Sequence, residues 1–262
     1  MNDHVVKSIG AYIDAVTDAS NQWDGASEYS TVWFRGIPHS DYKLQPRLYR
    51  DCEGSPSDQE GNIRLEFFNR ALPYMSTVYD RKQWDWYFLM QHYRVPTRLL
   101  DWTESALVAL YFALYDRRPG NTSPPAVWML NPHELNAIAI EQRRIVAPSE
   151  FQLQTYLPEA CNGPIVGKLP IAIHPQHADR RMAAQHSRFT LHGNLSTPLE
   201  DVPEFKRLLI DEHLIRISIE ASGDDSIDRL KRELTLLGMR NSTVFPDLEG
   251  LALDICEDYT PA

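Results

Sequence analysis

The fold is decided by the stretch QHYRVPTRLLDWTESALVALYFA, which covers residues 91–113. Within it, residues 95–101 are expected to form a short strand, because proline disfavours helix at the residue before it. Residues 103–115 are hydrophobic on most faces and predict a buried helix. This strand, followed at once by a buried helix, belongs to an α+β pattern that extends in both directions along the chain.

Polar residues are concentrated around the junction between this strand and this helix. Strand ends and helix N-termini are where anions and hydroxyl-bearing ligands bind. A structural interpretation is open as well, in which Asp101 or Thr103 caps the helix and Arg98 pairs with Asp101. The candidate residues are Gln91, His92, Arg98, Asp101, Thr103 and Ser105.

Upstream, residues 30–36 form a β-branched and aromatic run that ends in WFRG and predicts a strand entering a turn. On such a strand, Arg35 points to the face opposite Phe34 and Gly36. An arginine on a buried strand needs an anion or a carboxylate, so Arg35 either binds a phosphate or ribose or forms a structural salt bridge. Gly36 lets a ligand or a second backbone approach closely.

Downstream, RRMAAQHSRFTLHG at residues 180–193 places Gln185 ahead of a strand expected over 188–192. This glutamine is either a site residue or an ordinary surface residue. The histidines in this half of the chain lack the spacing of metal ligands, so we expect no metal. FPDLEG at 245–250 is a turn whose two acids either shape the turn or pair with the arginines named above.

The remaining elements follow from apolar periodicity. Helices are expected at residues 1–20, 63–78, 81–93 and 226–237, the last one stopped by Gly238. Further strands are expected at 126–130, at 166–174 and around Ile215, Ile217 and Ile219. Residues 51–62 are expected to form a loop, and 132–165 to be mixed and irregular. Because strands and helices do not alternate regularly, we predict an α+β fold with mixed, mostly antiparallel central sheets flanked by helices.

The composition is that of an ordinary folded protein, since 43% of the 262 residues are hydrophobic and 24% are charged. A net charge of -10 argues against a general nucleic-acid-binding protein but leaves room for a local basic cleft. Three dispersed cysteines, no secretory signal and no apolar run near the ~20 residues that span a bilayer predict a cytoplasmic protein without a membrane segment. All six tryptophans lie in the first half, which indicates a core built around the motifs found there.

Four segments together resemble the FRG domain family: WFRG at 33–36, the stretch at 91–113, the segment at 180–193 and FPDLEG at 245–250. The resemblance extends over nearly the whole chain. It implies one FRG-type domain over residues 1–262, with a helical lead-in at 1–25 and a core at 30–262. One position departs from the family pattern, because Arg94 stands where the family usually has glycine in QHYGxPTRLLDW.

The order of the motifs is also similar to that of the R-S-E type of ADP-ribosyltransferase, which implies an ADP-ribosyltransferase-like split β core and NAD as substrate. In that class, an arginine strand is followed by a strand with a hydroxyl-rich end, a helix with an A-x-x-F-A-like pattern and a strand that starts at a glutamate. The resemblance makes Arg35, Thr103 and Gln185 the catalytic residues, with glutamine in place of glutamate. The residues it implies for binding NAD are Arg35, Gly36, His92, Arg98, Asp101, Ser105 and Phe189.

The activity so implied is cleavage of the nicotinamide–ribose bond and transfer of ADP-ribose to an unidentified protein or nucleic acid, as a toxin or antiphage effector. Gln185 lacks the charge that would stabilise the positive charge developing on the ribose. Either Asp101, Glu104 or Glu249 supplies it, or the reaction is slow or absent. Two alternatives stay open: a metal-dependent nuclease or other phosphate-directed enzyme that uses the same cleft, and a non-enzymatic module that senses a nucleotide or a phage protein.

Overall fold

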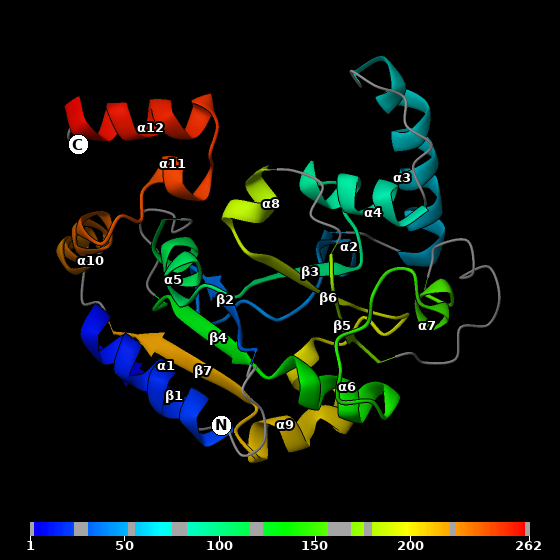
Figure 1. The fold of residues 1–262 in the computed structure, drawn as a ribbon, viewed down its shortest axis with the longest axis horizontal. Coiled ribbons are helices and arrows are strands. Elements are labelled where there is room, and N and C mark those ends of the chain that lie inside the picture. The colour runs from blue at the N-terminus through cyan, green and yellow to red at the C-terminus, as the bar shows by residue number, and fades with distance from the viewer. Residues whose placement is uncertain are drawn as a thin grey trace.

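The fold is known from a computed structural model, which describes residues 3–23, 31–51, 56–74, 83–115, 123–156, 169–175, 180–220 and 224–259. Within these residues, seven strands form one sheet in the order β1-β7-β4-β2-β3-β6-β5 (Figure 1). Neighbouring strands run antiparallel except β1 and β7, which run parallel. The expected mixed, mostly antiparallel architecture is confirmed. The strands are β1 (Asp3–Val6), β2 (Trp33–Ile37), β3 (Leu99–Thr103), β4 (Ala126–Leu130), β5 (Ile171–Ile173), β6 (Ser187–Leu191) and β7 (Leu214–Ile219).

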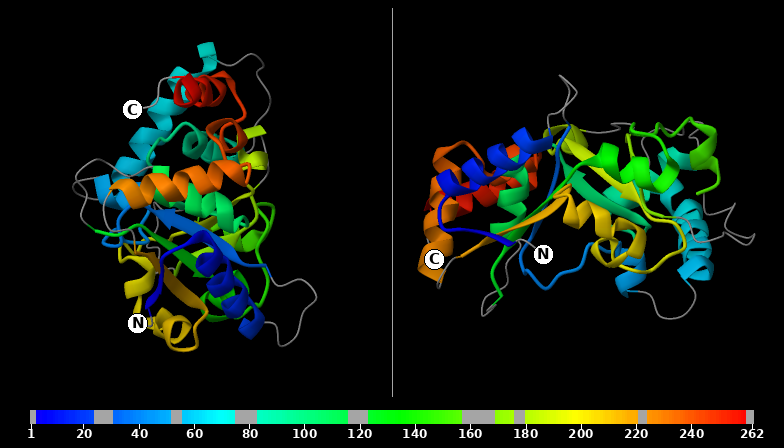
Figure 2. Two further views of the ribbon diagram at one scale, coloured as in Figure 1. Left: turned by 90° about the vertical axis from the view of Figure 1, so that its left-hand side faces the viewer. Right: turned by 90° about the horizontal axis from the view of Figure 1, so that it is seen from below.

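Helices flank the sheet, and those nearest the two chain ends gather at one end of the molecule, opposite α3 (Figure 2). The first six helices are α1 (Ile9–Trp23), α2 (Arg47–Asp51), α3 (Pro56–Ala71), α4 (Gln83–His92), α5 (Ala106–Tyr115) and α6 (Pro132–Ile140). The others are α7 (Phe151–Gln154), α8 (Arg180–Ala184), α9 (Lys206–Ile210), α10 (Asp224–Leu236), α11 (Asn241–Val244) and α12 (Leu248–Tyr259).

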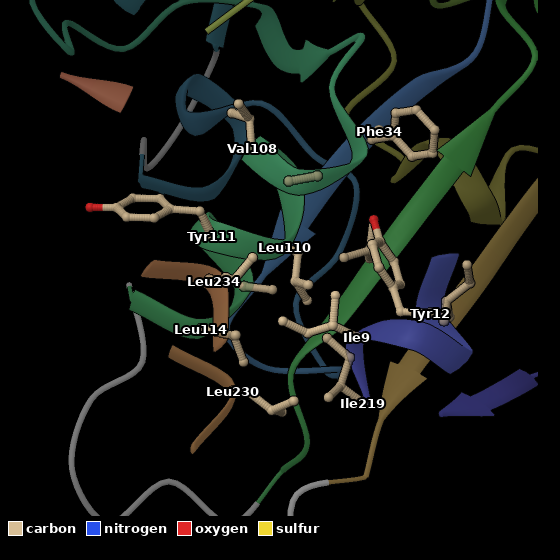
Figure 3. Packing of buried hydrophobic residues seen from close by; sticks show 14 of the residues in the cluster. Ile9, Tyr12, Phe34, Val108, Leu110, Tyr111, Leu114, Ile219, Leu230 and Leu234 are labelled. Carbon is tan, nitrogen blue, oxygen red and sulfur yellow. The ribbon is translucent and has the colours of Figure 1, made fainter. Parts of the chain in front are cut away.

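Helix α5 is the centre of the largest hydrophobic cluster. Its buried side chains pack between β2, β4 and β7 on one side and helices α1 and α10 on the other. Figure 3 shows Leu110 and Leu114 of α5 among side chains from α1 and α10. The apolar run of α5 has no polar face because it is surrounded in this way.

The other face of the same strands carries a tryptophan-rich cluster. Trp33, Trp102 and Trp128 are each at most 2% exposed and pack with residues of α6 and α9. These three come from β2, β3 and β4, which are adjacent in the sheet. Part of the tryptophan excess in the first half of the chain therefore forms one core layer beneath the central strands.

The sheet is nearly divided between β2 and β3. These strands are in register at a single residue pair, Phe34 with Thr103, whereas the β2–β4 and β3–β6 ladders each continue over five pairs. One half of the sheet is β1-β7-β4-β2 and the other is β3-β6-β5. The divergence of β2 and β3 opens a space between the two halves.

Gly36 is the contact that fixes α5 on β2. A Cβ atom at this position would lie 1.9 Å from the main-chain oxygen of Ala109 and 2.7 Å from the nitrogen of Ala113. Such distances leave no room for any side chain. Of the two expected reasons for a glycine here, close approach of a second backbone is the one that the geometry explains.

Several expected boundaries are wrong. Strand β4 is confirmed as Ala126–Leu130, and α10 ends near Gly238, which has a φ of 84°. Residues 3–6 form a strand rather than the start of a helix, because they pair with β7. Residues 56–62 belong to α3 instead of a loop, and 132–140 form α6, whose first turn is capped by the Asn131 side chain. The ends of the helices expected at 63–78 and 81–93, and the first part of the strand expected at 166–174, lie outside the described residues.

Replacing Gly36 with alanine tests the close packing of α5 on β2. We expect Gly36→Ala to lower the free energy of unfolding by about 3 kcal/mol, because the new methyl group forces backbone apart. The matched control is Gly61→Ala, since an added Cβ at Gly61 meets nothing within 4 Å and the residue lies inside α3. Alanine there should stabilise the helix by up to about 1 kcal/mol. Urea unfolding of both variants measures the difference, and effects of the same sign would contradict the packing described.

Candidate functional site

A pocket of about 410 Å³ lies where β2 leaves β3. Its lining comes from β2, β3 and β6 of the sheet, from α2, α4, α5 and α8, and from the segments after α4, α8 and α11. Seven elements from three separate regions of the sequence, residues 33–51, 83–115 and 180–191, therefore meet at this one position. The nearly divided sheet makes the pocket, because a continuous ladder would fill that space with backbone.

The pocket is strongly basic although the chain as a whole is acidic. Among the described residues that line it, Asp101 is the one carboxylate. Clefts lined by one sign of charge concentrate ligands of the opposite sign. The arginines of the lining are Arg35, Arg47, Arg50, Arg94 and Arg181.

Arg35 spans the two halves of the sheet. Its Nη1 atom donates to the main-chain oxygen of Asp101 on β3 at 2.6 Å. The Asp101 carboxylate accepts a 2.8 Å hydrogen bond from the Gln91 amide, and the Gln91 carbonyl accepts one from the Thr97 hydroxyl. A polar chain thus connects the strand arginine to helix α4 and holds the Asp101 side chain in place.

Thr103 connects the end of β3 to the turn before β6. Its hydroxyl donates to the main-chain oxygen of Gln185 at 2.7 Å and accepts from the Ser105 N–H at 3.0 Å. The Gln185 amide donates to the main-chain oxygen of Val244 at 3.2 Å. Two hydrogen bonds, one to its main-chain oxygen and one from its side-chain amide, therefore fix Gln185 just before β6. It is not a free surface glutamine.

Ser105, not Asp101 or Thr103, caps helix α5. Its hydroxyl accepts from the Val108 N–H at 3.3 Å, and its main-chain oxygen starts the helical ladder. The expected caps are wrong because β3 continues through Thr103, so both residues have strand conformation. Ser105 is not among the lining residues of the pocket.

Aromatic rings form the apolar part of the lining. Phe88 of α4 and Phe189 of β6 stack with their centroids 5.6 Å apart. Phe112 and Phe245 are half-buried, and the Arg181 guanidinium lies 4.2 Å above the Phe245 ring. A flat heterocycle entering the pocket would meet ring faces and edges as well as positive charge.

Arg98 has a structural position outside the pocket lining. It is 3% exposed, and its Nε atom lies 2.9 Å from both carboxylate oxygens of Glu60 in α3. It also donates to the main-chain oxygens of His192 and Tyr156. Burial raises the pKa of the Tyr87 hydroxyl, which bonds to the same Glu60 carboxylate. The expected pairing of Arg98 with Asp101 is wrong, and this buried ion pair is satisfied without any ligand.

The other candidates divide between pocket and surface. Gly36, His92 and Phe189 line the pocket together with Arg35, Asp101, Thr103 and Gln185. Glu104 instead forms a two-point ion pair with Arg188. Asp247 caps α12 by accepting from the Gly250 N–H at 2.9 Å, and Glu249 is exposed on that helix. Asp247 therefore shapes the turn, and neither acid of FPDLEG pairs with Arg35 or Arg98.

Sequence reasoning missed Arg47 and Arg50, which belong to the short helix α2. The signal that could have found them is their three-residue spacing, which puts both on one face of a helix. Among the described residues, no group of three histidine, cysteine or acidic side chains could hold a metal ion. No described helix has the length and apolar character needed to cross a membrane.

One comparison with known families finds a match. Residues 30–122 match the family model of the FRG domain. The matched part runs from β2 through α5 and includes four of the five arginines in the described lining of the pocket. The chain matches no curated protein and no solved structure. The φ of Arg94, 59°, is a left-handed value, which glycine adopts more readily than arginine does.

His192 provides a test of the buried polar layer next to the pocket. Burial, together with the positive charges of Arg98 and Arg35, lowers its pKa to about 3. Because the unfolded histidine takes up a proton near pH 6.5 and the folded one does not, the free energy of unfolding should fall as pH drops from about 6.5 toward 3. The slope from this one group is about 1.4 kcal/mol per pH unit.

The corresponding variant is His192→Gln, which has no titrating side chain. Urea unfolding at several pH values should show a shallower decline for this variant than for the parent protein. The half-buried His174, whose pKa is also lowered by burial, contributes equally to both proteins and cancels in the comparison. If the free energies of unfolding of the two proteins fell in parallel, folding would not lower the pKa of His192, and the prediction would be wrong.

Proposed function

We propose that this protein binds NAD in the basic pocket and acts on it as an ADP-ribosyltransferase-like enzyme. The observation that supports this most is that Arg35, Thr103 and Gln185, taken from three separate motifs, line the same pocket. They come from β2, the end of β3 and the turn before β6. The order and position of these residues fit the R-S-E arrangement, with glutamine in the last place.

The pocket offers groups that suit each part of NAD. Guanidinium groups bind the oxygens of a pyrophosphate in pairs, and five of them line the pocket. The half-buried rings of Phe112 and Phe245 suit a flat nicotinamide. The Gln185 side-chain carbonyl can accept a hydrogen bond from a ribose hydroxyl while its amide stays on Val244.

The bond to be broken joins the ribose to the nicotinamide nitrogen, and positive charge develops on the ribose as nicotinamide leaves. Gln185 brings a dipole but no charge to this point. Asp101 is the carboxylate that remains available within the described lining, and Gln91 holds it at 2.8 Å. We assign to Asp101 the electrostatic role that a glutamate would otherwise have, at longer range.

A second function is favoured by Gln185 itself. A neutral side chain among five arginines suits binding of an anionic nucleotide better than stabilisation of a cationic transition state. A nucleotide-sensing module would bind NAD or a related nucleotide with no release of nicotinamide. Calorimetric titration with NAD, combined with an assay of nicotinamide release, distinguishes the two functions. Binding with release supports the enzyme, and binding without release supports the sensing module. A protein that neither binds NAD nor releases nicotinamide would contradict both proposals.

Substitution of Arg35 tests the binding site. We expect Arg35→Ala to reduce NAD affinity and nicotinamide release by at least tenfold, because a charge-assisted contact to phosphate or ribose is lost. Arg216→Ala is the matched control: Arg216 is also a strand arginine that donates to a main-chain oxygen, that of Ser40 at 3.2 Å, but it does not line the pocket. Equal activity of the Arg35 variant and the parent, with both folded, would refute the assigned role.

Adding a negative charge at position 185 tests whether the neutral Gln185 limits cleavage of NAD. Gln185→Glu should raise the rate of nicotinamide release about tenfold, because a charged acceptor at the ribose is roughly twice as strong as a neutral one. Gln45→Glu is the control, since the Gln45 amide also donates to a main-chain oxygen but lies outside the pocket lining. A Gln185→Glu variant that binds NAD and still releases no nicotinamide would favour the sensing module.

A further inference from the structure

Arg94 occupies the left-handed turn that ends helix α4. Its N–H donates to the oxygen of Gln91, and the next N–H, that of Val95, reaches back to the oxygen of Met90; both bonds are 2.9 Å long. This pair of bonds is the usual glycine-ended stop of a helix and requires a left-handed residue at position 94. The φ of Arg94 is 59°, as the turn demands.

An arginine is an unfavourable residue for this turn. A side chain with a Cβ atom is strained in the left-handed region, and glycine is not. The hydrogen bonds of the turn involve the main chain alone, so they would form equally well with glycine. The fold itself therefore gives no reason for an arginine at position 94.

The side chain of Arg94 does have a place in the pocket. It is exposed, and it lines the pocket with Arg47 and Arg50 of α2. The Arg47 guanidinium donates to the main-chain oxygen of Arg94 at 2.7 Å, which ties α2 to the turn. Within the described part of the chain, the guanidinium groups of Arg50 and Arg94 have no carboxylate partner. Like charges in one pocket repel one another, and a bound anion relieves that repulsion.

We propose that Arg94 binds a phosphate group of the ligand, together with Arg50, at a subsite on the α2–α4 side of the pocket. Arg35 approaches the same pocket from β2, so the two arginines come from different elements. A ligand with linked phosphates, such as a pyrophosphate or a dinucleotide, is the chemical class that can contact both. The inference rests on the proposed function only in taking the ligand to be a nucleotide.

The test uses Arg94→Gly, which relieves the strain and removes the charge. We expect its melting temperature to rise by about 2–4 °C and its affinity for inorganic pyrophosphate, ADP and NAD to fall about tenfold. Higher stability with weaker binding is a combination that a purely structural residue does not give. Arg94→Lys, which keeps the charge and the strain, should retain most of the affinity without the gain in melting temperature.

Glu141→Gly is the matched control for relief of strain. Glu141 has a φ of 57°, ends helix α6, is exposed and does not line the pocket. Glycine there should raise the melting temperature by a similar amount and leave pyrophosphate affinity unchanged. Isothermal titration calorimetry and thermal unfolding of the full chain measure both quantities for all variants.

The outcomes separate this inference from the proposed function. If pyrophosphate and ADP bind in an Arg94-dependent way and NAD does not bind, the phosphate subsite stands and the proposed function fails. If Arg94→Gly binds and cleaves NAD as the parent does, the proposed function stands and the subsite is overturned. Unchanged pyrophosphate affinity in a stabilised Arg94→Gly protein also overturns it, as does a parent protein that binds no pyrophosphate.

Discussion

Helix α5 and strand β2 lie so close at Gly36 that no side chain fits between them. Much of the candidate site depends on this contact. Arg35 directly precedes the glycine, so the strand that carries the guanidinium is pressed against α5, a helix with six of its ten residues buried. The same helix begins immediately after Thr103 and Ser105, so its position fixes the end of β3 as well. One steric constraint therefore fixes the positions of Arg35 and Thr103, two of the three residues proposed for catalysis.

The other half of the sheet is fixed by a different kind of interaction. Arg98 enters a buried ion pair with Glu60, and its remaining donors are taken by main-chain oxygens. Taking two charges out of water is costly, and the cost is offset only where the charges are paired and further hydrogen-bonded, as Arg98 and Glu60 are here. The helix carrying Glu60 is thereby tied to β3. Because β2 and β3 share only the Phe34–Thr103 pair, each half keeps its own anchor and the pocket occupies the space between them.

Sequence patterns could predict the elements whose period and ending are both local. Strand β4 is one apolar run, and α10 ends near a glycine, so the sequence predicts both elements. Sequence patterns could not predict which distant residues and strands pair with one another. Glu60 lies 38 residues before Arg98, and the four residues of β1 become a strand only by joining β7 near the other end of the chain. Arg35 and Gln185 could be proposed because each lies in a motif, whereas Arg50 has a role only after folding brings α2 to the pocket.

The charge distribution decides what the pocket can do well. Among the described residues of its lining, five arginines face one carboxylate, so the pocket attracts anions in a chain with a net charge of -10. That balance favours the pyrophosphate part of a dinucleotide and opposes positive charge anywhere nearby, including on a ribose that is losing nicotinamide. A glutamate in place of Gln185 would offset this locally, but Gln185 is neutral and its amide is bonded to Val244. Of the carboxylates in the described lining, Asp101 is then the one left to counter the field of the arginines, and it is bonded to Gln91. If the proposed function is correct, the pocket is better arranged to hold a nucleotide than to cleave it rapidly, and the rate of cleavage would depend on how closely the ribose approaches Asp101.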